Sequence, residues 1–84
     1  MTFSAALHEL KMGSFISRSG WNGKGMWLEL VPADGWQRST PPGVSHLGDF
    51  ALLPWIGMKT ADDKFVPWLA SQTDILADDW GVLR

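Results

Sequence analysis

The densest group of potential ligand-binding residues lies at positions 20–25, where three glycines, an indole, an amide and a cation share six positions. Glycines expose backbone N–H groups and let a ligand approach closely. Trp21 can stack on a nucleobase, Asn22 can hydrogen-bond to its edge and Lys24 can contact a phosphate. The alternative is an ordinary tight hairpin covered by an aromatic ring, because Asn22-Gly23 is a strong hairpin signal. The GxxxxGK spacing of a Walker loop is absent.

A second candidate segment comprises residues 59–60 and 67–74. Ser71 is expected to cap a helix, with Asp74 three positions on, as in an aspartate variant of the capping box. A helix N-terminus presents free N–H groups and a partial positive charge that suit an anion. The alternative is that Ser71 and Asp74 only cap their own helix. The candidate ligand-binding residues of this segment are Lys59, Trp68, Ser71, Gln72 and Asp74.

Carboxylates and histidines form no catalytic or metal-binding pattern. Asp74, Asp78 and Asp79 lack the loop length and glycine spacing of an EF-hand, so Asp78 and Asp79 are expected to be solvated or to end a helix. His8 and His46 have no motif partner, and the chain has no cysteine. No hydrolase or zinc-protease motif is present. We therefore expect no catalytic residue, no metal and no cofactor.

The elements that must position these residues follow from apolar spacing and turn signals. Thr2, with Ser4 as the competing choice, caps a helix that stops at Gly13. Residues 32–48 are a long connection rich in proline and glycine. The expected strands cover residues 14–18, 26–31, 51–60, 65–66 and 80–83, and a short helix follows Ser71. The predicted class is α+β, a small antiparallel β-sheet packed with an N-terminal α-helix and a second short helix near the C-terminus.

Size and charge narrow the function classes. The 84 residues fit one small domain, expected over residues 1–84. A net charge of −2 and a pI near 5.4 argue against a protein that grips long nucleic acid. No apolar run approaches the roughly 20 residues of a membrane span, and the start has no secretory pattern. We therefore expect no membrane partner and a cytoplasmic location.

The six tryptophans are too many for one small core to enclose with every indole N–H bonded. Tryptophan is favoured at subunit interfaces and in ligand pockets. The remaining alternative is partial exposure on one face of the sheet.

Two blocks resemble the phage and prophage family of Thoeris anti-defence two proteins. They are W-N-G-K-G at residues 21–25 and P-W-x-x-S-Q-x-D-x-L-A-x-D-W at residues 67–80. Arg18, residues 58–62 and the N-terminal helix over residues 3–13 fit the same family. The resemblance spans about two thirds of the chain in the same order and leaves out the loop from residue 32 to 50.

The resemblance implies a molecular sponge of phage or prophage origin that works in the cytoplasm of a bacterial host. Members of that family are α+β homotetramers that bind, without cleaving it, the cyclic ADP-ribose isomer (a glyco-cyclic ADP-ribose) made by the TIR protein of Thoeris. Some also bind cyclic di- or trinucleotides at a separate pocket. On this basis no enzyme activity is expected.

Carried onto this chain, the resemblance places a pocket between subunits and assigns three kinds of contact. Trp21 would stack on the adenine. The side chains that would bond base or ribose groups are Asn22, Ser71, Gln72 and Asp74. The pyrophosphate would be neutralised by Lys24 and backbone N–H groups, with Arg18 or Lys59. Gly23 and Trp68 complete the two segments. The rival hypotheses are a nucleotide-signal hydrolase and an oligomeric interaction or scaffolding module with no small-molecule ligand.

Overall fold

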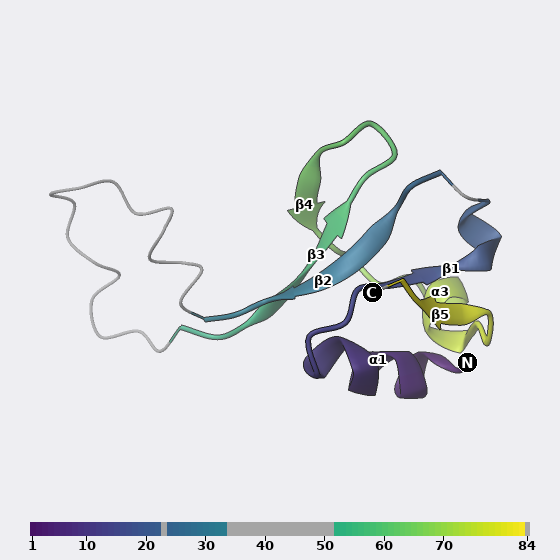
Figure 1. The fold of residues 1–84 in the computed structure, drawn as a ribbon, viewed down its shortest axis with the longest axis horizontal. Coiled ribbons are helices and arrows are strands. Elements are labelled where there is room, and N and C mark those ends of the chain that lie inside the picture. The colour runs from purple at the N-terminus through teal and green to yellow at the C-terminus, as the bar shows by residue number, and fades with distance from the viewer. Residues whose placement is uncertain (23, 34–51, 84) are drawn as a thin grey trace, which may run out of the picture.

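The computed structural model describes residues 1–22, 24–33 and 52–83, which form an α+β fold. A five-stranded antiparallel sheet has the strand order β4-β3-β2-β1-β5, and helix α1 lies across one of its faces (Figure 1). In chain order the elements are α1 (Phe3–Lys11), β1 (Ile16–Arg18), the 3₁₀ turn η1 (Ser19–Trp21), β2 (Trp27–Val31), β3 (Trp55–Lys59), β4 (Phe65–Pro67), α3 (Gln72–Leu76) and β5 (Trp80–Val82). The predicted fold class is confirmed.

Helix α1 begins and ends where its local signals indicate. The Thr2 hydroxyl accepts the backbone N–H of Ala5 at 3.2 Å, so Thr2 and not Ser4 is the N-cap. After the helix, Gly13 has a φ of +100°, a backbone conformation that suits glycine. Ala6 and Leu10 are fully buried against the sheet. A nine-residue helix is too short to be stable alone, so this packing must stabilise it.

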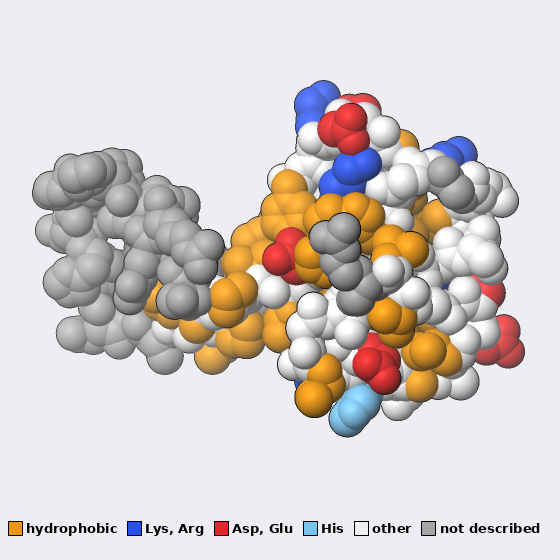
Figure 2. Space-filling model, in the orientation of Figure 1, with side chains coloured by type: hydrophobic (Ala, Val, Ile, Leu, Met, Phe, Trp, Pro, Cys, Tyr) orange, Lys and Arg blue, Asp and Glu red, His pale blue; other side chains and the backbone are white. Residues whose placement is uncertain are grey.

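The strand register places the core on the face that α1 covers. Ile16 pairs with Leu28, and Leu28 pairs with Met58 on its other side, so all three point to the same face. The buried core consists of Ala6, Leu10, Ile16, Leu28 and Trp80. In the orientation of Figure 1, hydrophobic side chains form a broad area over β2 and β3 (Figure 2).

The opposite face of the sheet carries a row of aromatic rings. Phe15 stacks on Trp27 with ring centroids 4.5 Å apart, and Phe65 lies between Trp27 and Trp55 at 6.3 and 6.0 Å. Gly57 lies beneath Phe65, since a Cβ at this position would come within 2.2 Å of the ring. The close approach of this ring to the backbone of β3 therefore requires glycine.

Three expectations about the strands need correction. The expected strand over 51–60 begins only at Trp55; residues 52–54 lie outside it, and Pro54 cannot donate to a strand ladder. Strand β4 continues through Pro67 and does not stop before it, because β4 is an edge strand where proline is tolerated. The expected tight Asn-Gly hairpin is instead a wider connection that opens with η1, although Asn22 does adopt a left-handed conformation with φ 58°. Gly23 and residues 34–48 of the long connection lie outside the described residues.

Candidate functional site

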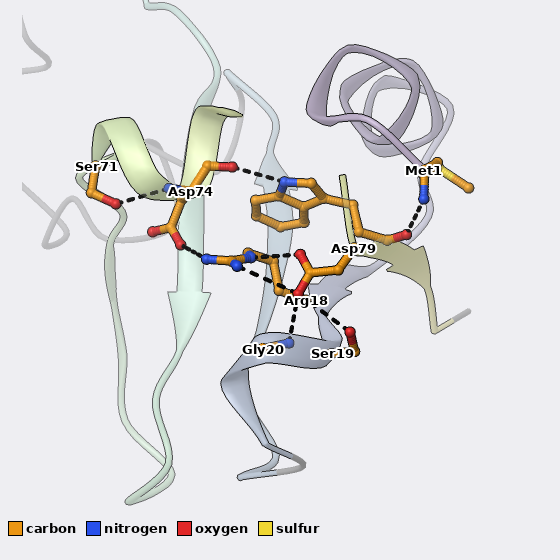
Figure 3. Close-up of polar contacts among 8 residues, drawn as sticks. Met1, Arg18, Ser19, Gly20, Ser71, Asp74 and Asp79 are labelled. Atoms are coloured by element: carbon orange, nitrogen blue, oxygen red, sulfur yellow. Dashed lines mark hydrogen bonds and ion pairs between the residues drawn. The ribbon is translucent and has the colours of Figure 1, made fainter. Parts of the chain in front are cut away.

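The Arg18 guanidinium joins the two segments that the sequence singles out. Arg18 ends β1, next to the glycine-rich segment, and its Nη1 donates to Asp74 Oδ1 of α3 at 2.7 Å. Its Nε donates to Asp79 Oδ1 at 2.8 Å (Figure 3). The β1–β5 register explains the meeting, because Arg18 pairs directly with Trp80, the residue after Asp79. Segments that are 56 positions apart in sequence therefore share one ion-pair cluster.

The expectation that Asp79 is solvated or only ends a helix is wrong, because its carboxylate is bonded within the ion-pair cluster. Besides Arg18, its Oδ2 accepts the Gly20 backbone N–H at 2.8 Å and the Ser19 hydroxyl at 3.3 Å. Its own backbone carbonyl accepts the Ser19 N–H at 3.2 Å. The side chain is 31 % exposed. Asp79 is part of the block at residues 67–80, but nothing in that local pattern shows that it contacts Arg18. The long-range pairing of β1 with β5 brings it to the site. Asp78 is exposed as expected.

The start of α3 shows why Asp74 can reach Arg18. The Ser71 hydroxyl accepts the Asp74 backbone N–H at 3.1 Å, so the predicted cap is confirmed. In a full capping box the side chain three positions after the cap would reach back to the backbone N–H of the cap residue. Here the Asp74 carboxylate turns to Arg18 instead, and its backbone carbonyl accepts the Trp80 indole N–H at 2.9 Å (Figure 3).

Two of the candidate indoles belong to one aromatic cluster around Trp80. Trp21 and Trp68 meet Trp80 edge-on, with ring centroids 5.3 and 6.1 Å away, and Phe3 contacts both Trp68 and Trp80. Trp21 and Trp68 are only half-buried, whereas Trp80 is buried. Trp21 ends η1, and Trp68 lies between β4 and α3, so each is close in sequence to an element that the ion-pair cluster joins.

The other candidate residues are placed around these contacts. Asn22, Lys24, Ser71 and Gln72 are exposed. Lys59 lies on β3, where its Nζ donates to the Gly25 carbonyl at 3.1 Å and pairs with Asp63 at 2.6 Å. It therefore contacts the end of the glycine-rich segment and not α3. Gly23 lies in the gap between the described ranges.

The electrostatics of the cluster favour hydroxyl donors over phosphates at its carboxylates. One guanidinium against two carboxylates leaves a net charge of −1. Hydrogen bonds to Asp79 and Asp74 raise the pKa of Arg18, and the bond from Arg18 is the main cause that lowers the pKa of Asp79 to about 2. Both groups are therefore charged at neutral pH. Within residues 1–22, 24–33 and 52–83, no three His, Cys, Asp or Glu side chains gather as metal ligands. In the same ranges no helix has the length and apolarity needed to cross a membrane.

The low pKa of Asp79 predicts acid-sensitive stability. Because the pKa is about 2 in the folded protein and 3.8 ordinarily, Asp79 stabilises the fold above about pH 4, and this contribution is lost as the pH falls through about 2. We expect the melting temperature of wild type to exceed that of Asp79→Asn at neutral pH. The gap should close as the pH is lowered towards 2 in a calorimetric series. A gap that stays constant over this range would show that the carboxylate charge contributes nothing.

Comparison with known proteins extends the resemblance of the two blocks to the whole chain. The model of a family described as the Thoeris anti-defense 2-like domain matches residues 1–83. The protein Thoeris anti-defense 2 of Bacillus phage SP01 is 41% identical over 87 residues, covering 99% of this chain and 94% of that protein.

Proposed function

This chain belongs to the Thoeris anti-defense 2-like family, a family of phage anti-defence against Thoeris, and from that premise we propose that it is a sponge for a nucleotide signal. It binds and sequesters a cyclic ADP-ribose-type signal made by bacterial TIR proteins, without cleaving it. Cyclic di- or trinucleotides are the second ligand class to test.

The contact between Arg18 and Asp74 is the observation that carries this proposal. It links Arg18, three positions before the W-N-G-K-G block, to the block at residues 67–80. Trp21 and Trp68, one from each block, both pack on Trp80 with half-buried rings. An aromatic ring next to charged and amide groups is the arrangement that binds a nucleobase and its sugar.

The charges of the site indicate which residues would bind the ribose and which would bind the pyrophosphate. A carboxylate has about four lone-pair positions, so the bond from Arg18 leaves Asp74 able to accept ribose hydroxyls. Arg18 is already paired with two carboxylates, which makes Lys24 and the turn backbone the better donors for the pyrophosphate. Asn22, Ser71 and Gln72 are exposed around this position and supply further polar contacts. Lys59 donates to the Gly25 carbonyl, so it would reach the ligand only from the Gly25 end of the glycine-rich segment.

Binding without turnover is consistent with the low pKa of Asp79. General catalysis needs a group whose pKa lies near the working pH. The pKa of Asp79 is lowered to about 2, so this carboxylate is a weak base and is not protonated at neutral pH. A sponge needs slow release and not proton transfer, because affinity is set mainly by the dissociation rate.

Self-association completes the proposal. Leu69 and Leu76 are 90 % and 79 % exposed, and Ile75 is also exposed, all within or just before the helix that carries Asp74. A second copy of this chain that covers these side chains would enclose the ligand between subunits, in a homotetramer. Native mass spectrometry should then show oligomers that carry intact ligand. Oligomers without any adduct would favour the scaffolding alternative.

Trp21→Ala should weaken binding of glyco-cyclic ADP-ribose by about 1–3 kcal/mol, the usual loss when a base-stacking aromatic is removed. Titration calorimetry gives the affinity, and Trp21→Phe is the matched control because it keeps an aromatic face. Circular dichroism must show that both variants fold, since the Trp21 ring also packs against Trp80. A folded Trp21→Ala protein with wild-type affinity would remove Trp21 from the site.

Release of the ligand separates the sponge from the hydrolase. The protein is incubated with glyco-cyclic ADP-ribose and denatured by heat, and the supernatant is examined by mass spectrometry. Recovery of intact ligand in proportion to protein supports sequestration. Recovery of a linear product supports hydrolysis and overturns the proposal.

A further inference from the structure

The donors that Asp79 accepts from lie in one short stretch that leads directly to Trp21. Its carboxylate accepts from the Arg18 guanidinium, the Ser19 hydroxyl and the Gly20 backbone N–H. Its backbone carbonyl accepts from the Ser19 N–H. Five hydrogen bonds from three successive residues therefore end on Asp79, which directly precedes the neighbouring strand β5.

The Asp79 carboxylate acts as the N-terminal cap of η1, because no residue of the turn caps it. The 3₁₀ turn η1 has Arg18 at its N-cap, and no side chain within the turn makes a capping bond there. The carboxylate that bonds the N–H of Gly20 comes from 59 positions away. A helix start without a capping acceptor leaves N–H groups unsatisfied, so this long-range bond fixes the conformation of the turn.

Gly20 lies close to the ends of the Asp79 and Arg18 side chains. A Cβ there would lie 2.9 Å from both Asp79 Oδ2 and Arg18 Nη2. A side chain at position 20 would therefore have to displace the carboxylate and the guanidinium from the turn.

We propose that Asp79 is a positioning residue for the nucleotide site. It presets the turn that presents Trp21 and Asn22, and it holds Arg18 against Asp74 so that both halves of the site keep one relative placement. This inference rests on the proposed function. Asp79 itself does not contact the ligand.

The sign of the effect of Asp79→Asn distinguishes positioning from simple electrostatics. The substitution removes a negative charge near an anionic ligand, so electrostatics alone would tighten binding. Loss of the preset turn does the opposite, because apparent affinity falls with the fraction of molecules in the binding conformation. If that fraction drops to about one tenth, the dissociation constant rises about tenfold.

The experiment titrates glyco-cyclic ADP-ribose into the full chain as wild type, Asp79→Asn and Asp78→Asn. Asp78 is the matched control, since it is the exposed neighbour and carries the same charge. We expect about tenfold weaker binding for Asp79→Asn, and unchanged or slightly tighter binding for Asp78→Asn. Hydrogen exchange without ligand should show faster exchange at the Gly20 amide in Asp79→Asn only.

The possible results distinguish a failure of the proposed function from a failure of the positioning role alone. Wild-type protein that does not bind the ligand overturns the proposed function, and the positioning role falls with it. Wild-type or tighter binding by Asp79→Asn overturns the positioning role alone. If Asp79→Asn does not fold, Gly20→Ala tests the same turn with every charge kept. It should also bind about tenfold more weakly, and wild-type affinity there would overturn the positioning role.

Discussion

Replacing Trp80 with alanine should lower the free energy of unfolding by about 3–5 kcal/mol. The side chain is 3 % exposed, and its ring contacts Phe3, Trp21 and Trp68. A domain of 84 residues is stable by only about 4–13 kcal/mol, so the loss removes a large share of the total. Urea denaturation followed by circular dichroism measures the change. We expect the midpoint to fall sharply, or the variant to be unfolded without urea.

Trp80→Phe is the control that separates the ring from its polar atom. It keeps most of the aromatic packing and loses only the Nε1–H bond to the Asp74 carbonyl, which is 2.9 Å long. The expected cost is about 1–2 kcal/mol, the usual cost of leaving one partly buried acceptor unpaired. If both variants are equally stable, the packing of the indole contributes little and the core assignment is wrong.

Local signals were enough to predict the two helix caps and the presence of each strand, but not where every strand begins and ends. The Thr2 and Ser71 caps are each set by a hydroxyl and the backbone three positions later, and the structure confirms both. Within the expected strand over residues 26–31, Trp27 lies on one face and Leu28 and Leu30 lie on the other, because the side-chain period of a strand is fixed.

Contacts between distant segments could not be predicted in the same way. The resemblance to the family implied that Arg18 or Lys59 would contact the ligand pyrophosphate, and the sequence alone does not show which residues pair with Arg18. The pairing of β1 with β5 brings two carboxylates to it, and this register depends on the whole sheet. For the same reason Asp79 was expected to be solvated.

The tryptophans show both what the sequence predicts and what depends on contacts between distant segments. Their number predicted that one core could not enclose them all. Of the five in the described residues, only Trp80 is buried. Trp21 and Trp68 cluster around Trp80, whereas Trp27 and Trp55 lie on the opposite face of the sheet. Composition therefore predicted that some indoles would lie outside the core, but the sheet register decides which of them lie beside the proposed ligand site.

Leu28→Ala should destabilise the fold by about 2–5 kcal/mol without touching the ion-pair cluster. Leu28 is fully buried in the middle strand, paired with Ile16 and Met58 beneath α1. The matched control is Leu83→Ala, since Leu83 is 56 % exposed and surface substitutions usually change stability by less than about 0.5 kcal/mol. Urea denaturation of both variants measures the difference. Because α1 is too short to be stable alone, Leu28→Ala should also speed amide exchange in the helix before it affects the Gly20 amide. Equal stability of the two variants would mean that the packing of α1 on the sheet does not hold this domain together.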